Sequence, residues 1–273
     1  MSRRNSISDI SHHLVIKGLA ACALIILVAP VVIVLITSLT EGQTLKFPPP
    51  GWSLRWYERL FDASASRQIH MAALNSLKVA LWAAAAAMLL GTCAAIGLAS
   101  MRSRRGRALD AMMMSPLVLP GLAYGLAALI FFSLLGLNPS LALMIIGHAI
   151  MIVPFVLRTT GASLTQLDPT LAECSASLGA SRFYTLRRIV LPIIFPGIAT
   201  GTFLAFMASI DNVPVSLFLS GPRSDMLPIR LWGMMESSLD VRVAAVSGVM
   251  IVVVLALMLV MERVVGLSRR LQS

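Results

Sequence analysis

Charged residues are scarce in this chain: they make up 12% of its 273 residues, against about 25% in an ordinary soluble domain. Apolar residues make up 58%, against about 45–50% in such a domain. This composition argues against a soluble enzyme. The formal net charge is +10, but aromatic residues are only 6% and the basic residues stand in short clusters between long apolar runs. That arrangement is typical of topology signals in a membrane protein and argues against nucleic acid as a partner.

Lysine is also rare, and its positions exclude one kind of nucleotide site. A phosphate-binding loop of the Gly-x-x-x-x-Gly-Lys-Ser/Thr type needs a hydroxyl residue after its lysine. The chain has three lysines, and Gly18, Phe47 and Val79 follow them. Neither Gly-x-Ser-x-Gly nor His-Glu-x-x-His occurs, so the sequence predicts no catalytic site. If the protein takes part in ATP-driven transport, hydrolysis must take place on another polypeptide.

Cysteine and histidine are few and do not cluster. Two of the three cysteines fall within apolar runs and the third in a polar loop, which implies no disulfide framework. The four histidines have no Cys or carboxylate neighbours at ligand spacing, so we predict no metal site. These residues are Cys22, Cys93, Cys174, His12, His13, His70 and His148.

Five stretches without Asp, Glu, Lys or Arg mark the membrane spans. One span needs roughly 17–25 mostly apolar residues. The stretch 111–157 is long enough for two passes, and its turn-like break lies at residues 136–140, where Asn138 precedes Pro139. The sequence therefore predicts an all-α polytopic membrane protein with six transmembrane helices. The five stretches are residues 18–40, 79–101, 111–157, 189–210 and 243–261.

The basic residues predict the orientation of these spans. With the N-terminus in the cytoplasm, fourteen Lys and Arg residues lie on the cytoplasmic face and seven on the other, as the positive-inside rule requires. The first stretch exceeds the roughly 7–15 residues of a signal-peptide core, so we expect it to stay attached. The predicted parts are a cytoplasmic segment 1–17, a transmembrane domain 18–265 with a cytoplasmic loop 159–190, and a cytoplasmic tail 266–273. The basic surplus favours contact with anionic lipid headgroups or, alternatively, with a charged substrate.

The cytoplasmic loop 159–190 is far longer than the median connection of about 4–6 residues. Asp168 and Pro169 suit an N-cap and the first helical position, which predicts a short helix over residues 170–178. Gly179 suits the left-handed conformation that ends a helix, and Ser181 suits the cap of a second helix that runs toward Pro192. Small residues on the short helix favour either the docking of another protein or a simple cover over the inner end of the bundle.

The same loop resembles a known motif. Its anchors are Glu173, then Gly179, then Ile189, Leu191 and Pro192. This spacing is similar to the EAA loop, Glu-Ala-Ala, three residues, Gly, nine residues, Ile-x-Leu-Pro, of permease subunits in binding-protein-dependent ABC importers. Residues 52–57, 75–77, 217–222 and 227–228 resemble the spermidine/putrescine-type group of these permeases.

The resemblance has one departure and several implications. Cys174 and Ser175 stand where the motif has two alanines, and both are small enough to keep close approach possible. The resemblance implies the type I (MetI-like) importer permease fold, in which the loop is a coupling helix that docks on a separate ATPase. It also implies as partners a homologous second permease, two ATPase subunits, which bind the ATP and magnesium, and a periplasmic solute-binding protein, in the bacterial inner membrane. The implied coupling residues are Glu173, Cys174, Ser175, Ala176, Gly179, Ala180, Ile189, Leu191 and Pro192.

Substrate-contacting residues are predicted from polar groups at membrane depth. The best cluster is Ser209, Asp211 and Asn212 at the outer end of the fifth span, with Asn75 in the second. Asp211 suits a cationic substrate; the alternative is a carboxylate that faces water, or interhelical hydrogen bonds. Other open alternatives are an importer of thiamine, iron or an organic phosphonate, or a self-sufficient carrier or channel, although no inverted repeat is visible. An intramembrane enzyme would need a catalytic dyad, and none is visible.

Aromatic residues and glycines mark three further local features. Trp52, Trp56 and Tyr57 are typical of membrane-interface anchors, or of a docking surface for the binding protein. Gly121 and Gly125, four residues apart, predict a close-packed helix face, as do Gly91 and the neighbouring alanines.

Overall fold

The computed structural model describes residues 7–101, 103–221, 224–238 and 240–265. Residues 1–6, the predicted tail 266–273, and Arg102, Pro222, Arg223 and Leu239 lie outside the described residues. Within the described part the chain is almost entirely helical, apart from two isolated β-bridges. The predicted all-α fold is therefore confirmed. The chain divides into two compact units, residues 1–66 with 234–256, and residues 67–233 with 257–273.

The first unit contains α1 (Ile7–Ser38), α2 (Arg55–Phe61) and the first part of α12 (Arg242–Val265). The hydroxyl group of Tyr57 on α2 lies 2.7 Å from that of Ser38 at the end of α1. The indole of Trp56 donates a hydrogen bond to the carbonyl of Gly42, and the guanidinium groups of Arg55 and Arg59 stack against its ring. These contacts order the loop that follows α1.

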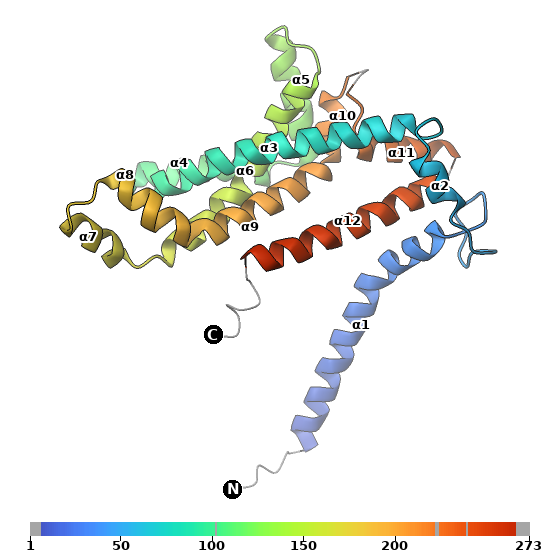
Figure 1. Cartoon of the computed structure of the whole chain (residues 1–273), viewed down its shortest axis with the longest axis horizontal. Helices are drawn as coiled ribbons and strands as arrows, with labels where there is room; N and C mark the ends of the chain where they lie inside the picture. The colour runs from blue at the N-terminus through green and yellow to red at the C-terminus, as the bar shows by residue number, and fades with distance from the viewer. Residues whose placement is uncertain (1–6, 102, 222–223, 239, 266–273) are drawn as a thin grey trace. The chain divides into compact units, whose positions relative to one another are not determined.

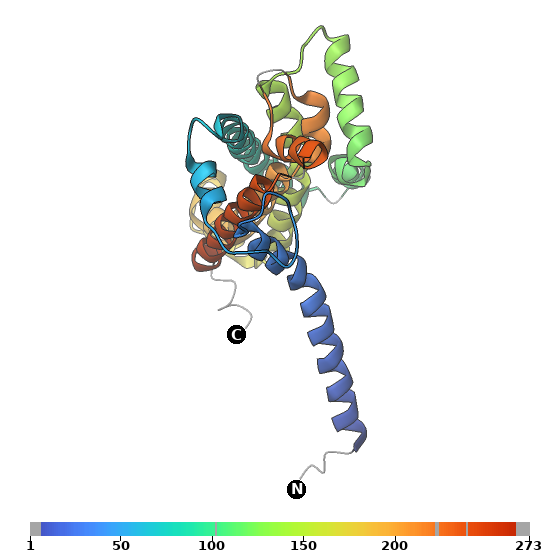
Figure 2. The same ribbon diagram turned by 90° about the vertical axis from the view of Figure 1, so that its right-hand side faces the viewer.

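The second unit is built around α3 (Arg67–Ala99), α6 (Leu141–Thr165) and α9 (Leu191–Ile210), which run side by side (Figures 1 and 2). The side chains where they meet are small: Ala83, Ala87 and Ala205 are fully buried. A Cβ atom at Gly91 would lie only 2.8 Å from the Cβ of Val156. Small residues let helix backbones approach closely in lipid, where no hydrophobic effect drives association. The predicted packing face on α3 is confirmed.

A second pair of helices packs beside this core. α5 (Gly121–Leu134) contacts the short α10 (Val213–Leu219), and both views show them next to each other. A Cβ atom at Gly125 would lie 2.7 Å from the carbonyl oxygen of Pro214, so the predicted Gly121 and Gly125 face packs on α10. α11 (Leu227–Ser238) follows and leads into α12.

The described helices include five that are long and apolar enough to span a membrane, and a bent pair that makes a sixth. The pair is α4 (Arg104–Val118) with α5, and the two helices meet at 105°. The sequence predicted one span here, with Pro116 and Pro120 as positions at which it can kink. The bend lies at Leu119 and Pro120, because proline lacks an N–H group and forces the residue before it into an extended conformation, with ψ 136° at Leu119.

Several helices extend beyond the predicted spans. α3 begins at Arg67 rather than at residue 79, and α6 continues past residue 157 to Thr165. The predicted loop 159–190 therefore shrinks to residues 166–181, which contain α7 (Pro169–Ser177). Charged residues end an apolar run, but a helix continues into water as long as its backbone hydrogen bonds are satisfied.

Candidate functional site

The candidate site is the short helix α7 and the turn that follows it, at one end of the second unit (Figure 1). Asp168 caps this helix, because its carboxylate accepts a hydrogen bond of 2.9 Å from the backbone N–H of Thr170. Pro169 occupies the first turn, where its missing N–H group costs nothing. Hydrogen bonds from Thr170 lower the pKa of the Asp168 carboxyl. The predicted start of this helix is confirmed.

Gly179 ends α7 in the left-handed conformation, with φ of 79°. Its N–H group donates to the carbonyl of Ala176, and the N–H of Ala180 donates to that of Ser175. This pair of bonds is a Schellman motif, which satisfies two carbonyl groups that the helix end leaves unpaired. The predicted glycine turn is confirmed.

A second helix begins three residues after Gly179. The hydroxyl of Ser181 accepts a hydrogen bond from the N–H of Tyr184, as predicted, and caps α8 (Arg182–Thr185). A π-helical turn, η1 (Leu186–Val190), joins α8 to α9. Pro192 explains this wide turn, because without an N–H group it cannot bond to the carbonyl four residues back.

One hydrogen bond ties the two loop helices together. Ser175, the single buried residue of α7, places its hydroxyl group 2.8 Å from that of Thr185 on α8. The other faces of α7 are open: Glu173, Cys174 and Ala176 are exposed. The arrangement is a short helix held to its neighbour by one buried edge, with an acidic side chain on the open face.

The predicted substrate residues lie elsewhere in the second unit, and most of them make structural hydrogen bonds. The amide group of Asn75 donates to the carbonyl of Asp225 at 3.1 Å, and the buried Asn212 accepts from the N–H of Val215 to cap α10. Ser209 is fully buried. Asp211 is exposed, and its carboxylate forms no hydrogen bond or ion pair with any described residue.

His148 links three helices of this unit and was not among the predicted site residues. It is fully buried on α6. Its Nδ1 atom lies 2.8 Å from the hydroxyl of Ser209 on α9, and its Nε2 atom lies 3.3 Å from the hydroxyl of Ser216 on α10. The signal for this role was a single histidine inside an otherwise uncharged run. A histidine at membrane depth needs hydrogen-bond partners within the bundle.

Comparison with known proteins identifies the family of this chain. Residues 87–270 match the family described as "Binding-protein-dependent transport system inner membrane component". The chain belongs to this family. It is 30% identical to the spermidine/putrescine transport system permease protein PotC of Haemophilus influenzae, over 85% of this chain and 89% of that protein. It is also 30% identical to the putrescine transport system permease protein PotI of Escherichia coli, over 81% and 80%.

Solved structures of ABC importers share the fold of this inner membrane component. One is a bacterial alginate ABC transporter in complex with an alginate pentasaccharide-bound periplasmic protein, with a TM-score of 0.69 at 16% identity over 98% of both chains. Another is the inward-facing MetNI methionine ABC transporter, with a TM-score of 0.62 at 16% identity, over 71% of this chain and 92% of that chain. The predicted MetI-like fold is confirmed.

Large apolar side chains on the loop of this inner membrane component were missed by the sequence analysis. Leu178 is 88% exposed, beside Gly179, and Phe183 on α8 is 71% exposed. Tyr184 and Leu171 are exposed as well. The loop therefore carries exposed apolar side chains as well as the exposed carboxylate of Glu173. Leu178 directly precedes the turn residue Gly179, and Phe183 follows the cap Ser181 by two positions, which was the available signal.

Other predicted positions have mixed outcomes. Of the three aromatic residues predicted as anchors or docking surface, Trp56 and Tyr57 make the internal contacts described above, and Trp52 is exposed. The implied loop anchors Ile189 and Leu191 are half-buried and Pro192 is exposed. Among the described residues no three His, Cys, Asp or Glu side chains gather in a way that could hold a metal ion.

Proposed function

We propose that this inner membrane component is the permease subunit of an ATP-driven importer and forms half of its translocation pathway. In this proposal it pairs with a homologous permease, two ATPase subunits and a periplasmic solute-binding protein, and both of its termini are cytoplasmic. ATP and magnesium bind to the ATPase subunits, so the chain itself is not an enzyme. The observation that carries the proposal is α7, a helix capped at both ends that exposes Glu173 in the register of the EAA loop.

The loop has the stiffness that coupling requires. Asp168 and Gly179 define the two ends of α7, and the bond between Ser175 and Thr185 joins α7 to α8. From Arg182 to Ile210 the chain then runs as one helical rod. Movement of α7 on the surface of an ATPase is therefore passed to the fifth span as displacement rather than lost in a flexible connection.

The proposed substrate class is a polyamine. Its support is the similarity to the spermidine/putrescine and putrescine permeases, each matched over about four fifths of this chain or more. A polyamine is a cation at neutral pH, and the exposed carboxylate of Asp211, which pairs with none of the residues that the structure describes, suits a cation in the pathway. A second candidate substrate is an aminophosphonate, because the chain is 25% identical to a putative 2-aminoethylphosphonate permease of Salmonella typhimurium over 86% of its length.

Transport by the reconstituted system tests the substrate. The chain is assembled in proteoliposomes with its cognate permease, ATPase and binding protein, and uptake of labelled putrescine, spermidine and 2-aminoethylphosphonate is measured with and without ATP. We expect ATP-dependent uptake of the polyamines. Uptake of the phosphonate alone would reject the polyamine class, and uptake by the purified chain without its partners would reject the importer proposal altogether.

Association with the ATPase tests the coupling role of Glu173. The substitution Glu173→Lys reverses the charge on the open face of α7 without changing its caps, so we expect the ATPase to be lost on co-purification. The matched control is Glu262→Lys, which makes the same charge change at an exposed position near the end of α12. Equal recovery of the ATPase with both variants would show that Glu173 does not contact it.

A further inference from the structure

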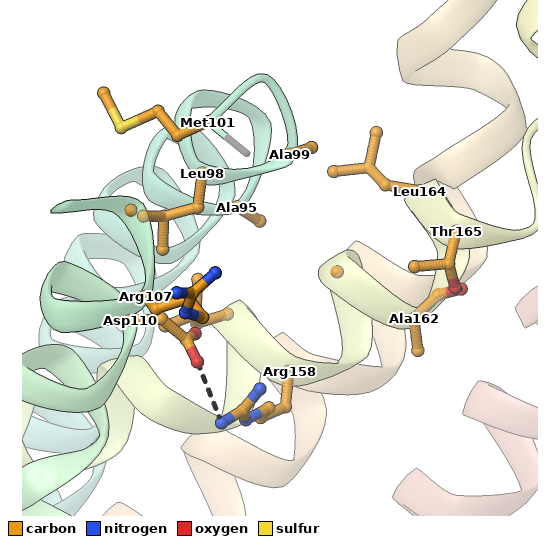
Figure 3. Close-up of a pocket in the computed structure, with 13 residues that line it drawn as sticks. Ala95, Leu98, Ala99, Met101, Arg107, Asp110, Arg158, Ala162, Leu164 and Thr165 are labelled. Atoms are coloured by element: carbon orange, nitrogen blue, oxygen red, sulfur yellow. Dashed lines mark hydrogen bonds and ion pairs between the residues drawn. The ribbon is translucent and has the colours of Figure 1, made fainter. Parts of the chain in front are cut away.

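A cavity of about 760 Å³ opens in the second unit, where three helices reach the same end of the bundle, and no residue of α7 lines it. Figure 3 shows the end of α3, the start of α4 and the end of α6 around it. One part of the wall is apolar and includes Ala95, Leu98 and Leu164. The other part carries Arg107, Asp110 and Arg158. The cavity is therefore amphipathic.

Its charged part has an excess of positive charge. Arg158 donates a hydrogen bond of 3.2 Å to Asp110, drawn as the dashed line in Figure 3. Arg107 forms no ion pair with any described residue. Arg158 donates a single hydrogen bond to the carboxylate of Asp110. A guanidinium group offers five N–H donors in a fork that fits a phosphate group. Two such groups beside one carboxylate leave the site able to bind an anion.

The position of the cavity relative to the membrane follows from helix length. Arg158 lies 17 residues after the start of α6 at Leu141, which at 1.5 Å per residue corresponds to about 26 Å along the helix. With Leu141 at the outer boundary of a hydrocarbon core about 30 Å thick, the Cα of Arg158 lies about 4 Å short of the predicted cytoplasmic boundary. The long side chain of an arginine covers this distance and places its guanidinium group among the headgroups. The basic residues 104, 105 and 107 of α4 lie at the same end.

We propose that this cavity binds the phosphate headgroup of an anionic phospholipid, held by Arg107 and Arg158. The shared chemistry is a phosphate anion, and the apolar wall favours a lipid over free phosphate because it gives an acyl chain a surface to lie on. Basic pockets between helices on the cytoplasmic side of a membrane bind headgroups of this kind. Asp110 competes with the phosphate for Arg158 and limits the affinity.

Native mass spectrometry of the full chain, purified alone and together with its ATPase, tests the proposal. The probes are phosphatidylglycerol, phosphatidylcholine and inorganic phosphate, each titrated separately. We expect preferential retention of phosphatidylglycerol, and about tenfold weaker retention in Arg107→Gln, since one charge-assisted contact is lost. Asp110→Asn frees Arg158 and is expected to strengthen retention severalfold, which a misfolded protein would not do.

Matched controls separate a built site from general attraction between charges. Arg263→Gln and Glu262→Gln make the same charge changes at exposed positions on α12 that do not line the cavity, and retention should not change in either variant. Equal retention of both lipids, or equal effects of the cavity and control variants, would overturn the proposal. So would binding of inorganic phosphate with the same sensitivity to Arg107→Gln, which indicates a free-anion site. Loss of the lipid on addition of the ATPase would show that protein, not lipid, covers the cavity.

Discussion

The turn at Gly179 gives the sharpest test of the coupling role, because its strain is confined to the backbone. With φ of 79°, this residue has the left-handed conformation, and a Cβ atom added there would meet nothing within 4 Å. The Cβ atom that Gly179→Ala or Gly179→Val adds therefore meets no neighbour. Gly179→Val places a β-branched residue where L residues are disfavoured by about 1–2 kcal/mol, and a value of about 2 kcal/mol is expected for valine.

This backbone strain lowers the population of loops that have the native turn. Because each 1.4 kcal/mol is a factor of ten in an equilibrium constant, about 2 kcal/mol lowers the ratio of loops with the native turn to loops with alternative conformations by about thirtyfold. Asparagine tolerates the left-handed region better than other residues with a side chain. We therefore expect uptake at equal membrane abundance to fall in the order wild type, Gly179→Asn, Gly179→Ala, Gly179→Val, with loss of ATPase association in the last.

The chain contains its own control for this experiment. Gly136 ends α5 with φ of 72°, has the same open surroundings, and forms the same Schellman pair of hydrogen bonds. Gly136→Val therefore carries the same strain at a turn that is predicted to lie on the opposite face of the membrane. We expect it to retain the ATPase. Unchanged uptake by Gly179→Val at equal abundance, or equal loss of the ATPase in both variants, would refute the reasoning.

The remaining predictions concern single hydrogen bonds. Ser175→Ala removes the bond from α7 to α8, worth about 1 kcal/mol, so uptake should fall about fivefold while Ser177→Ala leaves it unchanged. His148→Leu should lower the melting temperature, and His148→Asn should restore more of it than His148→Gln, because the Asn amide replaces the shorter bond to Ser209. Asp168, which caps α7, has a lowered pKa in the folded protein. Its stabilisation of α7 is therefore complete above the ordinary pKa of 3.8 and is lost as the pH falls through the folded pKa. The protection factors of the α7 amides, which correct for the intrinsic pH dependence of hydrogen exchange, should therefore fall below that pH in wild type, but not in Asp168→Asn, which caps without titrating.

Much of this molecule was predictable because the signals act locally. Uncharged runs located the membrane helices, and the order of Asp168, Pro169, Gly179 and Ser181 located both ends of α7 and the start of α8. Each cap forms within a few residues of chain, so its residue type is enough to place it. The helix ends beyond the spans were missed, since a helix does not stop where its charged residues begin.

Contacts between distant residues could not be predicted in the same way. The bonds of His148 to Ser209 and Ser216 join residues 61 and 68 positions apart, and that of Asn75 to Asp225 joins residues 150 apart. Because of these hydrogen bonds, several residues that were predicted to contact the substrate have a structural role. The bond between Ser175 and Thr185 likewise depends on how the turn folds α7 back on α8.

The amino-acid sequence alone determined that the chain crosses a membrane several times and carries a capped helix between its fourth and fifth spans. It did so because hydrophobicity and helix caps depend only on residue type and spacing. The tertiary structure alone decided which polar groups meet inside the bundle and where Arg107 and Arg158 come to share a cavity. Those outcomes depend on how small residues allow α3, α6 and α9 to approach, and that packing is a property of the assembled helices rather than of any one segment.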